Sequence, residues 1–173
     1  MRERARAMDE SLEFLTRAWT GEAFVHDGEH YGISTVQFLP RPVQRPRIPV
    51  WPVGVWPAPR SMRRAARWDG VLLQRSADAM GEGPLRPDEV AEAVAWLRTE
   101  RERLRSEGFA VAEDFDVVVD GELPADRVDA GATVREYAAA GATWFVESYW
   151  QPSVATAQFQ LERVRSGPPV LSP

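Results

Sequence analysis

The chain has 173 residues and a formal net charge of −5 at pH 7, with no cysteine and with arginine as all 21 of its basic residues. These values exclude a disulfide scaffold, a thiolate metal site, a cysteine nucleophile and a Schiff-base lysine, and they argue against a nucleic-acid partner bound through positive charge. No stretch approaches the roughly 20 apolar residues of a membrane span, and the charged N-terminus lacks the apolar region of a signal peptide, so we expect a cytoplasmic protein without a membrane partner.

The N-terminal segment predicts a helix over residues 3–20. Met8, Leu12, Leu15 and Trp19 recur at helical spacing, and Gly21 stands where a helix ends. Residues 22–47 read as an insertion, in which an alternating stretch surrounds the turn Asp27-Gly28. The turn separates His26 from His30, which argues against a helical zinc pair, and we expect no metal site.

Residues 48–167 predict four βα units. Short apolar runs indicate buried strands, at Ile48–Gly54, Val71–Leu73, Phe115–Val119 and Thr143–Val146. Amphipathic stretches follow them, with expected helix starts at Pro57–Pro59, Pro87, Thr133 and Ser153. Alternation of this kind predicts a parallel sheet with helices outside it, in one domain spanning residues 1–173.

Ligands of parallel βα proteins bind at the carboxyl ends of the strands, so residues there are the candidate site. After the first strand, Gly54 allows close backbone approach, the next helix offers free N–H groups, and Arg60 is a cation suited to phosphate. The alternative is a plain strand-to-helix turn with Arg60 in solvent.

The second and fourth strand ends carry further polar residues. Gln74 and Arg75 follow the second strand, and Glu147 with Tyr149 follows the fourth. Glu147 is the only carboxylate that we expect a strand end to direct toward a ligand, although an ion pair at the rim is the preferred interpretation. Asp69 is expected to pin the turn before its strand. GxSxG and GxGxxG motifs are absent, and the sequence identifies no catalytic residue.

Six segments, in order, carry a family resemblance. They are Ala7–Gly21, Phe24–Tyr31 (FVHDGEHY), Pro40–Trp51 (PRPVQRPRIPVW), Arg64–Val71 (RAARWDGV), Ala139–Phe145 (AAGATWF) and Arg165–Pro169. Together they make the chain similar to the luciferase-like flavin-dependent oxidoreductases, also called luciferase-like monooxygenases.

The resemblance implies the C-terminal half of a (β/α)8 TIM barrel that binds FMN or a deazaflavin coenzyme (F420) and acts on a small organic substrate. The flavin phosphate would lie on Gly54, Val55 and Trp56 with Arg60 nearby, although many members carry Gly-Gly where this chain has Gly54-Val55. The implied cavity wall consists of Trp51, Gln74, Trp144 and Tyr149.

The resemblance covers only the second half of the family's barrel. A four-stranded half-sheet has two open edges and an uncovered apolar face, so we expect a truncated enzyme that pairs with itself or with a separate N-terminal half. The alternative function is a non-catalytic half-barrel that serves interaction or assembly. A sugar-phosphate barrel enzyme would need strand-end carboxylates or a lysine, and lysine is absent.

Overall fold

A computed structural model describes residues 2–76, 83–151 and 154–171 of the chain. It contains two compact units, Met1–Pro49 and Val50–Pro173, and each is described by itself. Within the described ranges, no helix has both the length and the apolar character needed to cross a membrane.

The first unit is a helix with a β-hairpin. Helix α1 (Arg2–Ala18) is followed by strands β1 (Phe24–Asp27) and β2 (Gly32–Val36), which pair antiparallel. The Gly28 N–H donates to the Tyr31 carbonyl at 2.9 Å, which confirms the predicted turn after Asp27. Phe14 of α1 packs against Phe24, with ring centroids 5.3 Å apart.

Glu10 joins the helix of this unit to its hairpin. Its carboxylate accepts hydrogen bonds from His30 Nδ1 (2.8 Å) and His26 Nε2 (3.1 Å) and from the backbone N–H groups of His30 and Tyr31 (both 2.8 Å). Burial alone would raise the pKa of Glu10, but these hydrogen bonds outweigh it and lower the pKa to about 2. Both histidines of the chain therefore serve to hold this carboxylate.

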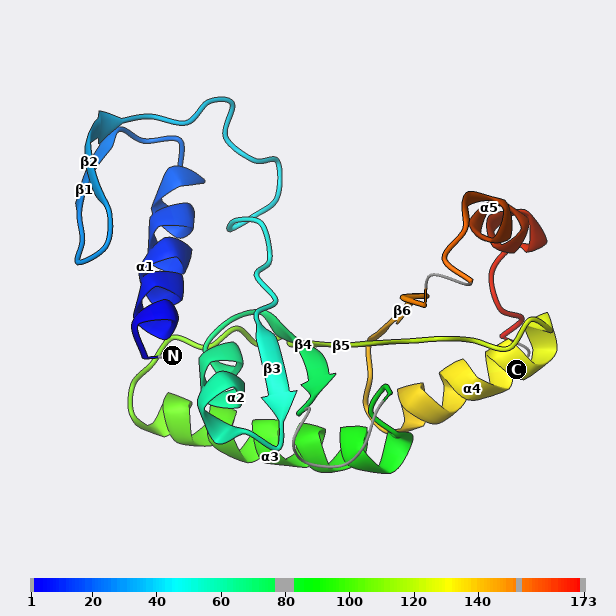
Figure 1. The fold of residues 1–173 in the computed structure, drawn as a ribbon. Helices are drawn as coiled ribbons and strands as arrows, with labels where there is room; N and C mark the ends of the chain where they lie inside the picture. Colours follow the sequence, from blue (N-terminus) through cyan, green and yellow to red (C-terminus); the bar gives the residue numbers. More distant parts are fainter. Residues whose placement is uncertain (1, 77–82, 152–153, 172–173) are drawn as a thin grey trace. The chain divides into compact units, whose positions relative to one another are not determined.

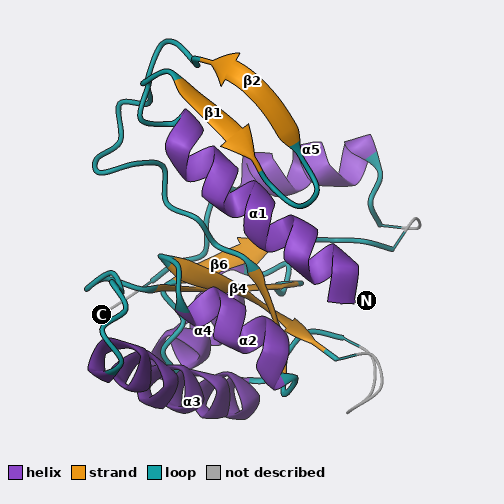
Figure 2. Cartoon of the chain, turned by 90° about the vertical axis from the view of Figure 1, so that its left-hand side faces the viewer, coloured by secondary structure: helices purple, strands orange, loops and turns teal. Residues whose placement is uncertain are grey.

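The second unit is built on a four-stranded parallel sheet in the order β3-β4-β5-β6. The strands are β3 (Val53–Trp56), β4 (Gly70–Arg75), β5 (Asp116–Gly121) and β6 (Trp144–Glu147). The helices are α2 (Pro59–Ala66), α3 (Pro87–Ser106), α4 (Arg127–Ala139) and α5 (Ala157–Ser166). Figures 1 and 2 show α2, α3 and α4 on one face of the sheet. The predicted α/β class with a parallel sheet is confirmed.

The largest differences from the predicted boundaries are at β3, α4 and α5. The first strand begins at Val53 and runs to Trp56, because Pro49 and Pro52 lack the N–H that a strand ladder requires. Helix α4 begins at Arg127, six residues before the expected start, because the Asp126 side chain caps it by accepting from two backbone N–H groups. Thr156 caps α5 by accepting from the Phe159 N–H, whereas the expected start at Ser153 lies outside the described residues.

The helix-covered face of the sheet forms the hydrophobic core. Its strand side chains are Val71, Leu73, Val117 and Val119, which pack against Met62 of α2 and the apolar face of α3. Asp69 pins the start of β4 as expected, since its carboxylate accepts from the Val50 N–H at 2.7 Å.

Arg101 of α3 is buried beside this core. Its guanidinium donates to the carbonyls of Ala66 (3.0 Å), Trp68 (3.2 Å) and Ala112 (2.5 Å) and lies 4.0 Å from the centre of the Phe115 ring. Burial is the main cause that lowers the pKa of Arg101 to about 10. The side chain therefore joins the end of α2 to the segment that precedes β5.

The opposite face of the sheet carries the alternate residues of each strand. Val53 pairs with Leu72, Leu72 with Val118, and Val118 with Trp144, which forms one row across the four strands. Toward the carboxyl ends of the strands, Val55 pairs with Gln74 and Asp120 with Val146. The sequence alternation thus brings one apolar row and one partly polar row to this face.

Candidate functional site

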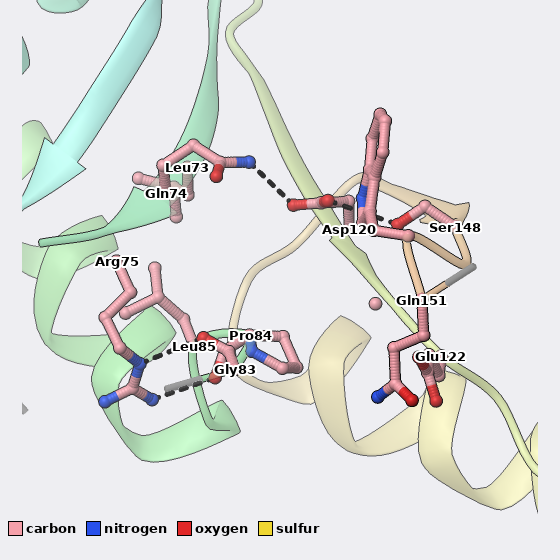
Figure 3. Close-up of a pocket in the computed structure, with 12 residues that line it drawn as sticks. Leu73, Gln74, Arg75, Gly83, Pro84, Leu85, Asp120, Glu122, Ser148 and Gln151 are labelled. Atoms are coloured by element: carbon pink, nitrogen blue, oxygen red, sulfur yellow. Dashed lines mark hydrogen bonds between the residues drawn. The ribbon is translucent and has the colours of Figure 1, made fainter. Parts of the chain in front are cut away.

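A pocket lies at the carboxyl ends of β4 and β5 (Figure 3). Its volume is about 470 Å³, and it is lined by Leu73, Gln74, Arg75, Gly83, Pro84, Leu85, Asp120, Gly121, Glu122, Ser148, Trp150 and Gln151. The paired positions of β4 and β5 run only as far as Leu72↔Val118. The pocket therefore opens where the two strands have stopped pairing, at the sheet edge where βα proteins bind ligands.

A polar network spans this opening. Gln74 Nε2 donates to Asp120 Oδ1 at 2.8 Å, and Ser148 Oγ donates to Asp120 Oδ2 at 3.2 Å (Figure 3). One donor comes from β4 and the other from the segment after β6, so neighbouring strand ends orient the carboxylate of β5. Each oxygen keeps a further lone pair for a ligand donor.

Asp120 is the residue that the sequence reasoning missed. It directly follows the apolar run Val117–Val119 at the carboxyl end of a strand, the same position that drew attention to Gln74 and Glu147. The expectation that Glu147 is the only carboxylate directed toward a ligand from a strand end is therefore wrong, because Asp120 lies at a strand end and lines this pocket.

Arg75 supports the wall of the pocket. Its guanidinium binds both oxygens of Glu89, at 2.8 and 2.5 Å, and the two side chains are only 8% and 5% exposed. It also donates to the carbonyls of Gly83 and Pro84, at 3.2 and 2.8 Å. The charge of Arg75 is thus matched by Glu89, and its hydrogen bonds fix the segment that begins at Gly83.

Glu147 and Tyr149 lie beside α5, where they line a second pocket of about 290 Å³. Arg163 Nε donates to Glu147 Oε1 at 2.5 Å, which confirms the preferred interpretation of Glu147 as an ion-pair partner. The Tyr149 hydroxyl lies 2.5 Å from the same oxygen and 3.1 Å from the Leu123 carbonyl. Burial and the neighbouring carboxylate raise the pKa of Tyr149.

The residues expected to hold a phosphate lie at the end of β3 and the start of α2. Gly54, Val55 and Trp56 belong to the strand itself, so the connecting segment begins only at Pro57. A Cβ on Gly54 would lie 2.5 Å from Val71 Cγ2 and 2.8 Å from Met62 Sδ, so this glycine permits close packing of α2. The Val55 N–H donates to Ser61 Oγ at 3.0 Å.

The first turn of α2 is open to an anion. Its N-cap residue, Ala58, provides no side-chain hydrogen bond, and no acidic residue lies in the first turn. A helix that begins at Pro59 leaves the N–H groups of Arg60 and Ser61 without intrahelical acceptors. Arg60 is itself exposed, so a guanidinium and a positive helix end occur together.

Trp51 and Trp144 lie at the other end of the strands. Their ring centroids are 5.7 Å apart, Trp51 borders Gly70, and Trp144 Nε1 donates to Asp116 Oδ1 at 3.0 Å. Gly70 and Asp116 are the first residues of β4 and β5. The expected cavity wall is therefore not brought together, because Gln74 lines the first pocket, Tyr149 the second, and the two tryptophans meet at the amino ends.

The sequence model of the luciferase-like monooxygenases matches residues 1–167 and so covers both units. The chain belongs to the luciferase-like monooxygenase family. No curated protein matches the chain. Membership supports an enzyme of the flavin-type oxidoreductase class at the level of the family, whose members generally bind flavin-type cofactors and small-molecule substrates.

Proposed function

We propose that this luciferase-like monooxygenase is a flavin-dependent oxidoreductase acting on a small organic substrate, with FMN or the deazaflavin coenzyme bound across the carboxyl ends of β3 to β6. The observation that carries the proposal is the pairing of Val55 with Gln74. Paired strands lie about 4.8 Å apart, so the open first turn of α2 and the pocket at Gln74 belong to adjacent strand ends.

The described residues fit a flavin phosphate at the start of α2. The N–H groups of the first turn and the Arg60 guanidinium are hydrogen-bond donors, and both favour negative charge. Gly54 contributes to this site through packing, since it lets α2 approach the sheet, and Val55 contributes through the Ser61 hydroxyl that it binds. Trp56 lies against Trp96, with ring centroids 6.4 Å apart, and so stiffens the strand end.

The pocket beside it fits a small organic substrate next to the flavin ring. Gln74 and Ser148 hold the Asp120 carboxylate in place, and Trp150 adds an aromatic wall. When bound, the flavin would supply hydride-transfer or oxygen-activation chemistry. The chain's own residues would bind the phosphate, orient the ring and line the substrate space.

Flavin titration tests this proposal. Purified protein should quench the fluorescence of FMN or of the deazaflavin coenzyme at micromolar concentration, and FMN should bind more tightly than riboflavin, which lacks the phosphate. Arg60→Ala should weaken FMN binding about tenfold or more and leave riboflavin binding unchanged, because a hydrogen bond to a charged group contributes roughly 1.5–3 kcal/mol. Arg67→Ala, at the other end of α2, is the control. If neither cofactor binds, the proposal fails.

We also propose that the sheet is part of a TIM barrel completed by further strands, for which a second copy of the chain is a suitable source. Among the described strands, β3 and β6 each pair with one neighbour, and Trp144 and Val146 of β6 are 53% and 46% exposed. Four parallel strands from each copy would give the barrel count of eight. Light scattering should then show a dimer, and a stable monomer would contradict this arrangement.

The same open edges favour the second candidate function, a non-catalytic module for interaction or assembly. The two functions differ in the titration described above. A dimer that binds no flavin would support the assembly module, whereas a dimer that binds FMN through Arg60 would support the oxidoreductase.

A further inference from the structure

We infer that the pocket formed by Asp120, Gln74, Ser148 and Trp150 selects organic cations, so that the substrate carries a protonated amine or amidine on an apolar body. This inference rests on the proposed function, because it assigns a substrate class to the same strand-end site. It concerns the chain's own side chains and can be tested with simple ligands.

The charges that line the pocket are the first support. Of its described lining residues, the ionisable ones are Arg75, Asp120 and Glu122. Arg75 is held by both oxygens of Glu89, so its charge is neutralised where it lies. The carboxylates of Asp120 and Glu122 are left facing the pocket, and they favour a positive ligand and oppose a carboxylate, sulfonate or phosphate.

The hydrogen bonds of Asp120 are the second support. Its two oxygens accept from an amide and a hydroxyl, which are neutral donors and leave the negative charge uncompensated. The same bonds fix the carboxylate, so a ligand does not have to order it on binding. A charge-assisted hydrogen bond from an ammonium or amidinium group to a fixed carboxylate is among the stronger polar contacts in proteins.

Trp150 is the third support. It lines the pocket and is 82% exposed, so its indole face is available to a ligand. A cation over an indole face gains roughly 0.5–2 kcal/mol. Carboxylates and an aromatic face in one pocket make a combination suited to a cationic group with an apolar body.

A set of three probes with one ring and different charges tests the inference. Benzamidine is a cation, benzamide is neutral and benzoate is an anion, and their binding to the full chain can be measured by ligand-observed NMR at pH 7.5. Benzamidine should bind at least tenfold more tightly than benzamide, with benzoate weakest. Equal binding of the three probes, or preference for benzoate, would overturn the inference.

Variants assign the selectivity to this pocket. Asp120→Asn should reduce benzamidine binding about tenfold, to the level of benzamide. Asp114→Asn removes the same charge from an exposed position just before β5 and should leave binding unchanged. If Asp120→Asn fails to fold, Glu122→Gln and Trp150→Leu alter exposed residues, and each should lower the preference for benzamidine over benzoate at least threefold. An unchanged preference in every folded variant would refute the assignment.

The outcomes separate this inference from the proposed function. Asp120→Asn should not change the FMN-to-riboflavin affinity ratio, which depends on Arg60. Selective benzamidine binding without flavin binding would leave the cation pocket in place and refute the oxidoreductase. Flavin binding without benzamidine selectivity would support the oxidoreductase and refute the cation pocket.

Discussion

Gly54→Ala is predicted to destabilise the second unit because the added methyl group has no space. Its Cβ would lie 2.5 Å from Val71 Cγ2, about 1 Å closer than the optimal separation of two carbon atoms, and 2.8 Å from Met62 Sδ. Val71 and Met62 are both fully buried, so neither can move into solvent. Overpacking of this kind costs roughly 1–3 kcal/mol, which exceeds the approximately 0.4–1 kcal/mol gained by restricting the unfolded chain.

Urea unfolding followed by circular dichroism measures this cost. Gly54→Ala should lower the free energy of unfolding by about 1–2 kcal/mol, the difference between these two effects. Gly121→Ala is the control in the same sheet, because its Cβ would meet neighbours at ordinary distances of 3.4 Å and beyond. The double variant Gly54→Ala with Val71→Ala should lose less than the sum of the single losses, since Val71→Ala removes the clashing atom. A Gly54→Ala protein as stable as the wild type would refute the packing argument.

Two further predictions concern carboxylates that hold neighbouring groups in place. Glu10→Gln should weaken the helix–hairpin unit at pH 7. Because the folded pKa of Glu10 is about 2 against an ordinary value of 4.5, the wild type should lose this stabilisation as the pH falls from 4.5 through 2, whereas the variant should not. Urea unfolding at several pH values, followed by the His26 and His30 NMR signals, measures the stability of both proteins. Parallel stability curves for the wild type and the variant would contradict the prediction. Glu89→Gln should cost about 3–5 kcal/mol in urea unfolding because it breaks the buried ion pair with Arg75. Glu92→Gln, on the exposed face of α3, should change stability by less than about 0.5 kcal/mol.

The parallel sheet was predictable because its strands are short apolar runs separated by amphipathic helices. Val71–Leu73 and Val117–Val119 lie within β4 and β5. A continuous apolar run followed by an amphipathic helix is typical of a strand in a parallel sheet covered by helices. The start of β3 was not predictable from hydrophobicity. Ile48 and Val50 are apolar enough for a strand, but Pro49 and Pro52 have no N–H to donate. The carbonyls of Val50 and Pro52 still accept from Asp69 and Leu72, and the regular two-way pairing begins only at Val53.

The sequence predicts where the candidate site lies better than it predicts which side chains line it. The rule that ligands bind at strand carboxyl ends selects Gln74, which lines the pocket, but it does not say which polar side chains pair with each other. Arg75 and Glu147 occupy strand-end positions like that of Gln74 in the sequence, yet each is engaged in an ion pair, with Glu89 and Arg163 respectively. Such pairings depend on where α3 and α5 lie, and one sequence does not contain that information in its local pattern.

The contact between Trp51 and Trp144 provides an optical reporter of folding. The two indoles belong to opposite edges of the sheet, and their rings meet although the residues are far apart in the chain. The contact can form only after β3, β4, β5 and β6 have all aligned, so it depends on residues that are far apart in the sequence. Difference spectra between the wild type and a Trp144→Phe variant in the near-ultraviolet would therefore follow the completion of the sheet, separately from the helical signal that forms from local contacts.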